Sequence, residues 1–457
     1  MSNQADRFLW GTATAALQIE GASHDDGRGD SSWDVFARQE GNTYRGDTAD
    51  IACDHYHRWE QDLELLNALG VGAYRFSVSW PRVMPSGRGV VNGPGLDFYD
   101  RLVDGLCARG IVPMVTLMHS DLPQALELAG GWAKRETALA FAEYASVVHR
   151  RLADRVDLWL TVNEPWVMAW QGYGYGRHAP GLQDPRQAVA ALHHMLLGHG
   201  LAVRAMRADG SESSFGVAAN VNPVRPISQR SADVAAARRW DGHVHRSVLD
   251  PLFGRPLSDD LVSHYRAVSD FEHVRPGDAE TIAGSSDFLG INYYRPEYVG
   301  AGGDAGDRVT KTELIVPEGV ATTGMGWPID PAGLTETLQR IHAECPGVPL
   351  FVTENGTACY DYPDPSGLIN DVERVDFLRS HVAAALAARE HGVDLRGYFA
   401  WSLLDNFEWA EGYAQRFGLT YVDFRTQARL PKRSFHWYRD EIARRSVRTG
   451  SAAAASP

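Results

Sequence analysis

Eight short apolar segments recur along the 457-residue chain, and each has about the length of one β-strand. They are rich in β-branched and aromatic residues and do not alternate cleanly between apolar and polar positions. This pattern is typical of strands that are buried on both faces of a parallel sheet. The eight segments are residues 8–15, 71–78, 111–118, 156–162, 215–221, 287–293, 349–354 and 397–403.

Between these segments, apolar residues recur at spacings of three and four, as they do in helices with one buried face. The clearest examples are residues 59–69, 97–109, 136–152 and 372–390. Strands that alternate with helices eight times predict an α/β protein, a single-domain (β/α)8 barrel over residues 1–445. A doubly wound open sheet is the alternative, but it requires a Gly-rich phosphate loop after the first strand, and residues 11–17 form a poor one.

Two segments fall outside this alternation. Residues 300–326 are rich in glycine and polar side chains, and we expect a long surface loop there. Residues 446–457 are of low complexity, and we expect a disordered C-terminal tail.

Composition excludes several classes of partner. The chain has 44 Lys and Arg against 58 Asp and Glu, a net charge of −14, which argues against binding nucleic acid or an anionic membrane surface. There is no apolar stretch of about 18 residues and no signal-peptide pattern at the N-terminus, so we expect a cytoplasmic protein. The four cysteines are too scattered for a disulfide framework or a metal site.

Two glutamates follow predicted strands at positions where barrel enzymes carry their chemistry. Glu164 comes just after the fourth strand, and Glu354 ends the seventh. In a closed barrel both would face one mouth, and two facing carboxylates are what glycoside hydrolysis requires. The alternative is a pair of ordinary helix-capping or surface glutamates.

Further polar and aromatic residues lie at the other predicted strand ends. Amide, imidazole and carboxylate groups bind sugar hydroxyls, while the C–H face of a sugar ring packs on an indole. Each residue has a plainer interpretation, such as a structural histidine, a buried ion pair or a core tryptophan, but their convergence on one rim favours a sugar site. These residues are Gln18, Arg75, His119, Tyr293, Trp401, Glu408 and Trp409.

The chain resembles family 1 glycoside hydrolases, the β-glucosidase family, over residues 6–440. The resemblance rests on motifs that occur in the family's order. They are FLWGTATAALQIEGA (8–22), YRFSVSWPRVMP (74–85), LTVNEP (160–165), GYGYGRHAPG (172–181), GINYY (290–294), VTENG (352–356), WSLLDNFEW (401–409) and RFGLTYVDF (416–424).

This resemblance implies a retaining double displacement on a small-molecule β-glycoside or oligosaccharide, with no metal or organic cofactor. Glu354 matches the nucleophile and Glu164 the general acid/base, whose pKa we expect the nearby charge of Glu354 to raise. Arg75 and Tyr293 match groups that contact the nucleophile, and Trp327 matches the aromatic residue that stacks on the leaving group. The residues that match the sugar-binding positions are Gln18, His119, Asn163, Trp401, Glu408 and Trp409.

One departure concerns the third strand, where HSDLP (119–123) stands in place of the usual HWDLP. Ser120 removes an indole beside the sugar's 3-hydroxyl, which puts the choice of sugar in doubt. Glu408 and the lack of lysine in 409–416 argue against 6-phosphorylated sugars, and Glu164 argues for O-glycosides. The sequence predicts a β-glucosidase that acts mainly on glucosyl residues, with fucosyl or galactosyl residues as further substrates. Three alternatives stay open: action on a modified sugar, transglycosylation, and a non-catalytic sugar-binding role.

Overall fold

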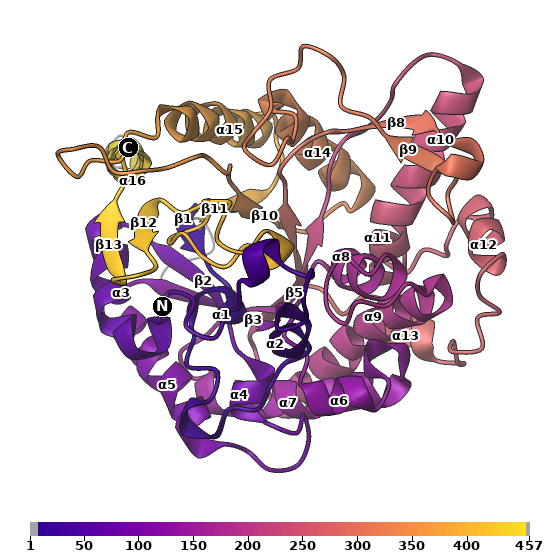
Figure 1. Ribbon diagram of the computed structural model, residues 1–457, viewed down its shortest axis with the longest axis horizontal. Coiled ribbons are helices and arrows are strands. Elements are labelled where there is room, and N and C mark those ends of the chain that lie inside the picture. Colours follow the sequence, from indigo (N-terminus) through magenta and orange to yellow (C-terminus); the bar gives the residue numbers. More distant parts are fainter. Residues whose placement is uncertain (1–7, 454–457) are drawn as a thin grey trace.

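A closed barrel of eight parallel strands forms the centre of the computed structural model, which describes residues 8–453 (Figure 1). The first strand pairs with the second and with the last, so the sheet has no edge. All eight predicted strands are present, which confirms the barrel and excludes the doubly wound open sheet. In barrel order they are β1 (Leu9–Ala13), β11 (Leu395–Trp401), β10 (Leu350–Asn355), β7 (Phe288–Asn292), β5 (Ser214–Asn220), β4 (Leu158–Asn163), β3 (Val112–Met118) and β2 (Ala73–Ser77).

The interior of the barrel is filled by side chains rather than open. Each barrel strand contributes at least one buried residue to a single apolar cluster, in which three alanines lie on β1, β2 and β5 and three phenylalanines lie on β7, β10 and β11. This packing closes the barrel beneath its carboxyl ends and leaves only the mouth free for a ligand. The eight residues are Ala13, Ala73, Met114, Leu160, Ala218, Phe288, Phe351 and Phe399.

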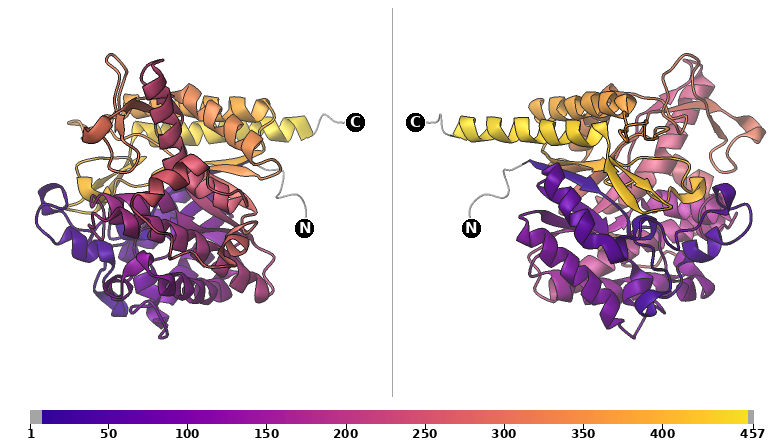
Figure 2. Two further views of the ribbon diagram at one scale, coloured as in Figure 1. Left: turned by 90° about the vertical axis from the view of Figure 1, so that its right-hand side faces the viewer. Right: turned by 60° about the vertical axis from the view of Figure 1, so that its left-hand side comes forward.

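Helices cover the outside of the barrel (Figures 1 and 2), as the spacing of apolar residues predicts. The long ones are α3 (His55–Leu69), α5 (Gly93–Ala108), α7 (Arg135–Leu152), α9 (Pro185–Ala208), α14 (Pro331–Glu344), α15 (Val372–Glu390) and α16 (Arg433–Ala453). Shorter ones lie in the connections: α1 (Ala16–Ile19), α2 (Ser32–Ala37), α4 (Trp80–Val83), α6 (Gln124–Leu128), α8 (Pro165–Val167), α10 (Ser231–Asp241), α11 (Ser247–Leu252), α12 (Asp259–Arg266) and α13 (Asp278–Ile282).

The segment 300–326 is not the plain loop that its composition predicts. It continues β8 (Glu297–Ala301) into a hairpin with β9 (Thr312–Leu314), and β6 (Val224–Pro226) completes a small three-stranded sheet. Gly302, Gly303 and Gly306 lie in the turn of this hairpin, and because glycine and polar residues predominate there, the composition of the segment does not indicate the strands on either side. A second small sheet pairs β12 (Thr420–Asp423) with β13 (Ala428–Pro431).

The C-terminal helix α16 extends into the segment that we expected to be disordered. Its backbone is helical to Ala453 as a continuation of the helix that begins at Arg433, whereas residues 454–457 lie outside the described residues. Both ends of the described chain lie on the same side of the molecule (Figure 2). Between residues 8 and 453, no helix combines the length and the hydrophobicity needed to cross a bilayer.

Candidate active site

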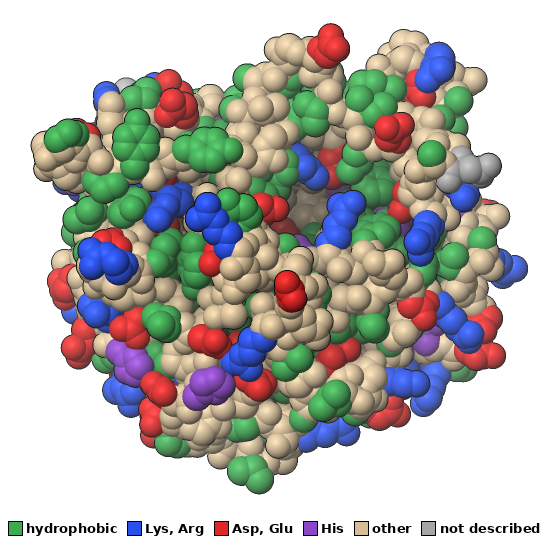
Figure 3. Space-filling view, viewed as in Figure 1, with side chains coloured by type: hydrophobic (Ala, Val, Ile, Leu, Met, Phe, Trp, Pro, Cys, Tyr) green, Lys and Arg blue, Asp and Glu red, His purple; other side chains and the backbone are tan. Residues whose placement is uncertain are grey.

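A cavity of about 270 Å³ opens at the carboxyl ends of the barrel strands, where Figure 3 shows a hollow in the centre of the surface. Glu164 directly follows β4 and Glu354 lies near the end of β10, and both side chains line this cavity. The closure of the barrel therefore brings together two carboxylates that stand 190 positions apart in the sequence.

Two donors hold the carboxylate of Glu354. Arg75 in β2 donates from Nη1 to Oε1 at 2.7 Å, and Tyr294 donates its hydroxyl to Oε2 at 2.6 Å. Glu354 is only 4% exposed, and the Arg75 side chain is only 1% exposed. Each oxygen of the carboxylate therefore accepts one short hydrogen bond, and the two bonds fix its position in the cavity.

The expectation that the Tyr293 side chain contacts the carboxylate of Glu354 is wrong; its backbone N–H donates to the backbone carbonyl of Glu354 at 3.0 Å. Tyr293 donates its hydroxyl to the carbonyl of Asp330 at 2.6 Å and packs near His381, away from the cavity. Successive residues at a strand end point to opposite sides, so the next residue, Tyr294, faces inward. The paired tyrosines of GINYY therefore differ in role, and the second one makes the contact.

The glycine of the VTENG segment is required by packing. A Cβ atom on Gly356 would lie 1.9 Å from the carbonyl oxygen of Trp401. This close approach places the end of β10 against the end of β11, where Trp401 lines the cavity beside Glu354.

Glu164 lies in a different environment from Glu354. Its Oε1 accepts one hydrogen bond, from Asn292 Nδ2 at 2.9 Å, and no positive side chain is paired with it among the described residues. Its backbone has a φ of +46°, in the left-handed region that costs a non-glycine residue free energy. This turn directs the side chain from the end of β4 into the cavity.

The pKa of Glu164 is raised to about 8, mainly because the carboxyl is buried and secondarily because of the charge of Glu354. We expected like-charge repulsion to be the main cause, and the structure places desolvation first. The direction is as expected: Glu164 keeps its proton at neutral pH, so it can donate that proton to a leaving group.

A network of amides joins the two carboxylates and fixes the orientation of His119. Asn163 accepts on Oδ1 from Arg75 at 2.6 Å and from Asn292 at 3.0 Å, so its Nδ2 must be the group that faces His119 Nε2 at 3.0 Å. An Nε2 that accepts leaves the proton on Nδ1. Burial and the charge of Arg75 lower the pKa of His119 well below its usual value, so the neutral ring offers one N–H donor.

Three buried polar atoms of the predicted sugar-binding residues have no hydrogen-bond partner among the described residues: His119 Nδ1, Gln18 Oε1 and Glu408 Oε2. His119 and Glu408 line the cavity, whereas Gln18 is fully buried and outside its lining, with its Nε2 donating to Asn406 Oδ1 and to the carbonyl of Phe407. Burial, followed by the charges of Glu354 and Glu164, raises the pKa of Glu408 to about 8. An unsatisfied buried polar group costs about 1–3 kcal/mol, which a hydroxylated ligand can offset.

Indole rings flank these polar atoms. The rings of Trp401 and Trp409 lie 5.8 and 5.9 Å from the His119 ring and are nearly parallel to it. At the other end of the cavity, Trp327 packs on Tyr294 at 5.5 Å, and the guanidinium of Arg295 lies 5.1 Å above the Trp327 ring. The cavity thus has a polar end over indoles and an outer end lined by an aromatic ring, as a glycoside would require.

Several residues that line this cavity could not be predicted from hydrophobic periodicity, among them Trp166, His178, Asn222 and Arg295. Trp166 lies in the short helix α8, and the other three lie in connections beyond the strand ends, where periodicity carries no signal. Tyr294 could have been found, because it stands two positions after Asn292 and shares its inward face.

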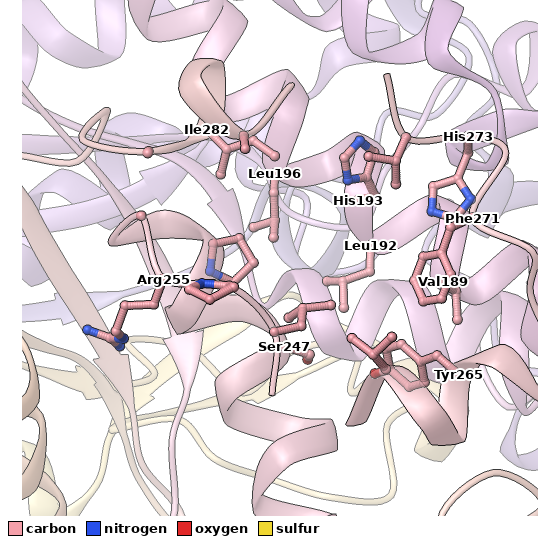
Figure 4. Close-up of a pocket in the computed structure, with 18 of the residues that line it drawn as sticks. Val189, Leu192, His193, Leu196, Ser247, Arg255, Tyr265, Phe271, His273 and Ile282 are labelled. Carbon is pink, nitrogen blue, oxygen red and sulfur yellow. The ribbon is translucent and has the colours of Figure 1, made fainter. Parts of the chain in front are cut away.

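A second cavity, of about 750 Å³, lies between α9, α11, α12 and α13 (Figure 4). Its lining is mostly apolar and includes Leu192, Phe271 and two histidines, His193 and His273. None of its lining residues belongs to a barrel strand, so it is remote from the carboxylates in sequence and in fold, and we do not assign the chemistry to it.

Paired carboxylates at the mouth of a (β/α)8 barrel, beside indoles and amides, define a glycoside hydrolase. Comparison with known proteins agrees: the model of "Glycosyl hydrolase family 1" matches residues 2–447. The chain therefore belongs to glycosyl hydrolase family 1. It is an O-glycosyl hydrolase, and the family acts with retention of anomeric configuration.

Named relatives resemble the chain over nearly its whole length. It is 44% identical over 439 residues to beta-glucosidase A of Thermotoga maritima, with 95% of this chain and 96% of that one covered. It is 46% identical to the bifunctional beta-D-glucosidase/beta-D-fucosidase of Bifidobacterium breve, with 96% and 98% covered. The solved structure of the Thermotoga maritima beta-glucosidase in complex with castanospermine superimposes with a TM-score of 0.91 at 42% identity, covering 97% of this chain and 99% of that one.

Proposed function

We propose that this enzyme is a β-glucosidase that removes terminal non-reducing β-D-glucosyl residues, with Glu354 as nucleophile and Glu164 as general acid/base. The observation that carries the assignment is the unequal environment of the two carboxyls. Glu354 is held by Arg75 and Tyr294, whereas Glu164 is buried with a pKa of about 8.

The reaction follows from these two environments. Glu164 gives its proton to the glycosidic oxygen while a carboxylate oxygen of Glu354 bonds to the anomeric carbon, and the C–O bond to the leaving group breaks. Glycosylation removes the charge of Glu354. The pKa of Glu164 then falls, because the repulsion between the two carboxylates no longer raises it. Glu164 then takes a proton from water, whose oxygen displaces Glu354 and restores the free enzyme.

The remaining side chains of the polar end bind the sugar in this proposal. Neutral His119 donates from Nδ1, Gln18 accepts on Oε1, and Glu408 offers its unpaired oxygen to sugar hydroxyls. Asn163, Trp401 and Trp409 complete this subsite, with Trp401 as the platform beneath the ring, and Trp327 stacks on the leaving group.

A panel of 4-nitrophenyl β-D-glycosides tests this assignment. We expect fast release of nitrophenol from the glucoside, and from the fucoside as a second activity, since a relative at 46% identity is named for both. We expect almost none from the 6-phosphoglucoside, because the phosphate would meet Glu408 and Glu411 at the cavity wall. NMR should detect the β-anomer as the first product. A preference for the 6-phosphoglucoside, or an α-anomer as first product, would contradict the proposal.

Ser120 provides a test of sugar recognition at the 3-hydroxyl. It lines the cavity beside His119, with a φ of +73°. Replacing Ser120 by Trp should supply one N–H donor and raise the discrimination between glucosides and 3-deoxyglucosides by up to about tenfold. The measurement is the ratio of kcat/KM for the two substrates in both proteins. An unchanged ratio in a folded variant would show that this position does not select the sugar.

A further inference from the structure

The loop that joins β10 to α15 displays two tyrosines to solvent. Tyr360 is 76% exposed and Tyr362 is 75% exposed, although aromatic rings are usually half-buried or better. Figure 3 shows hydrophobic side chains gathered at the upper left of the central hollow, over α15 and the loop before it. Leu368 on the same loop is also 66% exposed.

These rings stand on a loop that is firmly anchored. Asp361, between them, is buried and accepts hydrogen bonds from Arg374 at 2.7 Å and from Lys432 Nζ at 2.6 Å. Further along, Asp364 Oδ1 accepts from the backbone N–H groups of residues 366 and 368. Rings presented by a rigid loop lose little conformational entropy when they bind a ligand.

A groove of about 590 Å³ runs beside the tyrosines and adjoins the outer end of the active-site cavity. The segment 322–327 borders both spaces: Thr322 and Thr323 line the groove, while Met325 and Trp327 line the cavity. The N–H of Gly324 donates to the carbonyl of Ala358 at 3.0 Å and ties this segment to the tyrosine loop.

The chemistry of the groove selects one kind of ligand. Its described lining includes four carboxylate residues and no lysine or arginine. Of the cations that contact this lining, Arg374 and Lys432 are buried in ion pairs, whereas Arg433 is exposed and donates to Asn370 Oδ1 at 2.8 Å. Four carboxylates against one exposed guanidinium disfavour an anionic ligand. Flat phenol rings, threonine hydroxyls and carboxylate acceptors are instead the groups that bind an uncharged, polyhydroxylated chain.

We infer that Tyr360 and Tyr362 form a distal subsite for an uncharged oligosaccharide whose non-reducing end lies in the active-site cavity. This inference rests on the proposed β-glucosidase activity. A long substrate extends out of the cavity past Trp327 and lies across the segment 322–327. Its sugar units nearer the reducing end then stack on the two tyrosine rings. Short substrates end before the rings and gain nothing from them.

The test is the dependence of kcat/KM on chain length, measured with cello-oligosaccharides of two to six units. In the wild-type enzyme we expect kcat/KM to rise with length. Replacing both Tyr360 and Tyr362 by Ala should lower kcat/KM for the longest chains about 5- to 10-fold and leave cellobiose and 4-nitrophenyl β-D-glucoside nearly unchanged. The double replacement by Phe keeps both ring faces and should keep most of the increase of kcat/KM with chain length.

Leu128→Ala is the matched control, since Leu128 is 80% exposed on α6 and should leave the chain-length profile unaltered. The inference would be overturned if kcat/KM of the wild type did not depend on chain length, or if the increase of kcat/KM with chain length persisted in the double alanine variant. It would also be overturned if the double alanine variant lost kcat/KM equally on all substrates. Failure to cleave 4-nitrophenyl β-D-glucoside at all would instead contradict the β-glucosidase assignment, so the two failures are distinguishable.

Discussion

Replacing Glu354 by glycine should reduce hydrolysis by a factor on the order of 10⁴–10⁶, because no other carboxylate can form the bond to the anomeric carbon. The fold should persist. Arg75 loses one acceptor but keeps the carbonyl of Thr353 at 2.9 Å, Asn163 Oδ1 at 2.6 Å and Thr116 Oγ1 at 3.2 Å. The measurement is kcat for 2,4-dinitrophenyl β-D-glucoside, with circular dichroism to verify folding.

Azide or formate should restore turnover of this variant. The small anion would occupy the space of the lost carboxylate, near the donors Arg75 and Tyr294, and would attack from the same face. The product should then have inverted configuration, an α-glucosyl azide or formate. Glu411→Gln is the control, since Glu411 lines the same cavity but is exposed, and its activity should stay near that of the wild type. Near-normal activity of Glu354→Gly without added anion would rule out Glu354 as nucleophile.

Replacing Glu164 by alanine should produce the second largest effect, and this effect should depend on the leaving group. Cellobiose must gain a proton as its bond breaks, so its kcat/KM should fall on the order of 10³-fold. Dinitrophenolate leaves without a proton, so kcat/KM for that glucoside should change by less than about tenfold. Glu408→Gln is the control: a residue that binds the sugar should affect both substrates alike. Equal losses for both substrates in Glu164→Ala would mean that another group donates the proton.

The dependence of kcat/KM on pH in the wild type should also show that Glu164 donates the proton. Glu164 acts as an acid only while protonated, so kcat/KM for cellobiose should fall as pH rises through about 8. Dinitrophenyl glucoside needs no acid, so its kcat/KM should show little of this alkaline fall. The fall for cellobiose should remain in Glu408→Gln, which separates the two carboxyls whose pKa is raised to about 8.

The barrel could be predicted because its strands are buried on both faces and therefore appear as uninterrupted apolar runs. The hairpin of β8 and β9 could not, since both strands are short and a Gly-rich turn dominates the composition between them. The helical backbone of residues 446–453 could not be predicted either, because the segment is of low complexity and contains glycine, serine and threonine, which are weaker helix formers than alanine.

Only part of the active site could be predicted from the sequence. Glu164 and Glu354 could be placed at one mouth from strand order alone. The choice between Tyr293 and Tyr294 depends on which way each side chain points, and the cause of the raised pKa of Glu164 depends on how deeply the carboxyl is buried. Neither quantity is encoded in residue spacing.

The placement of both chain ends on one side of the molecule has a practical consequence. Strand β1 starts at Leu9 on the amino-end face of the barrel, opposite the mouth that holds Glu164 and Glu354. A resin, an electrode or a fused partner attached beyond either end would therefore leave the mouth facing solution. Immobilised enzyme should retain access to soluble substrates, whereas coupling through side chains near Tyr360 would obstruct the route to the cavity.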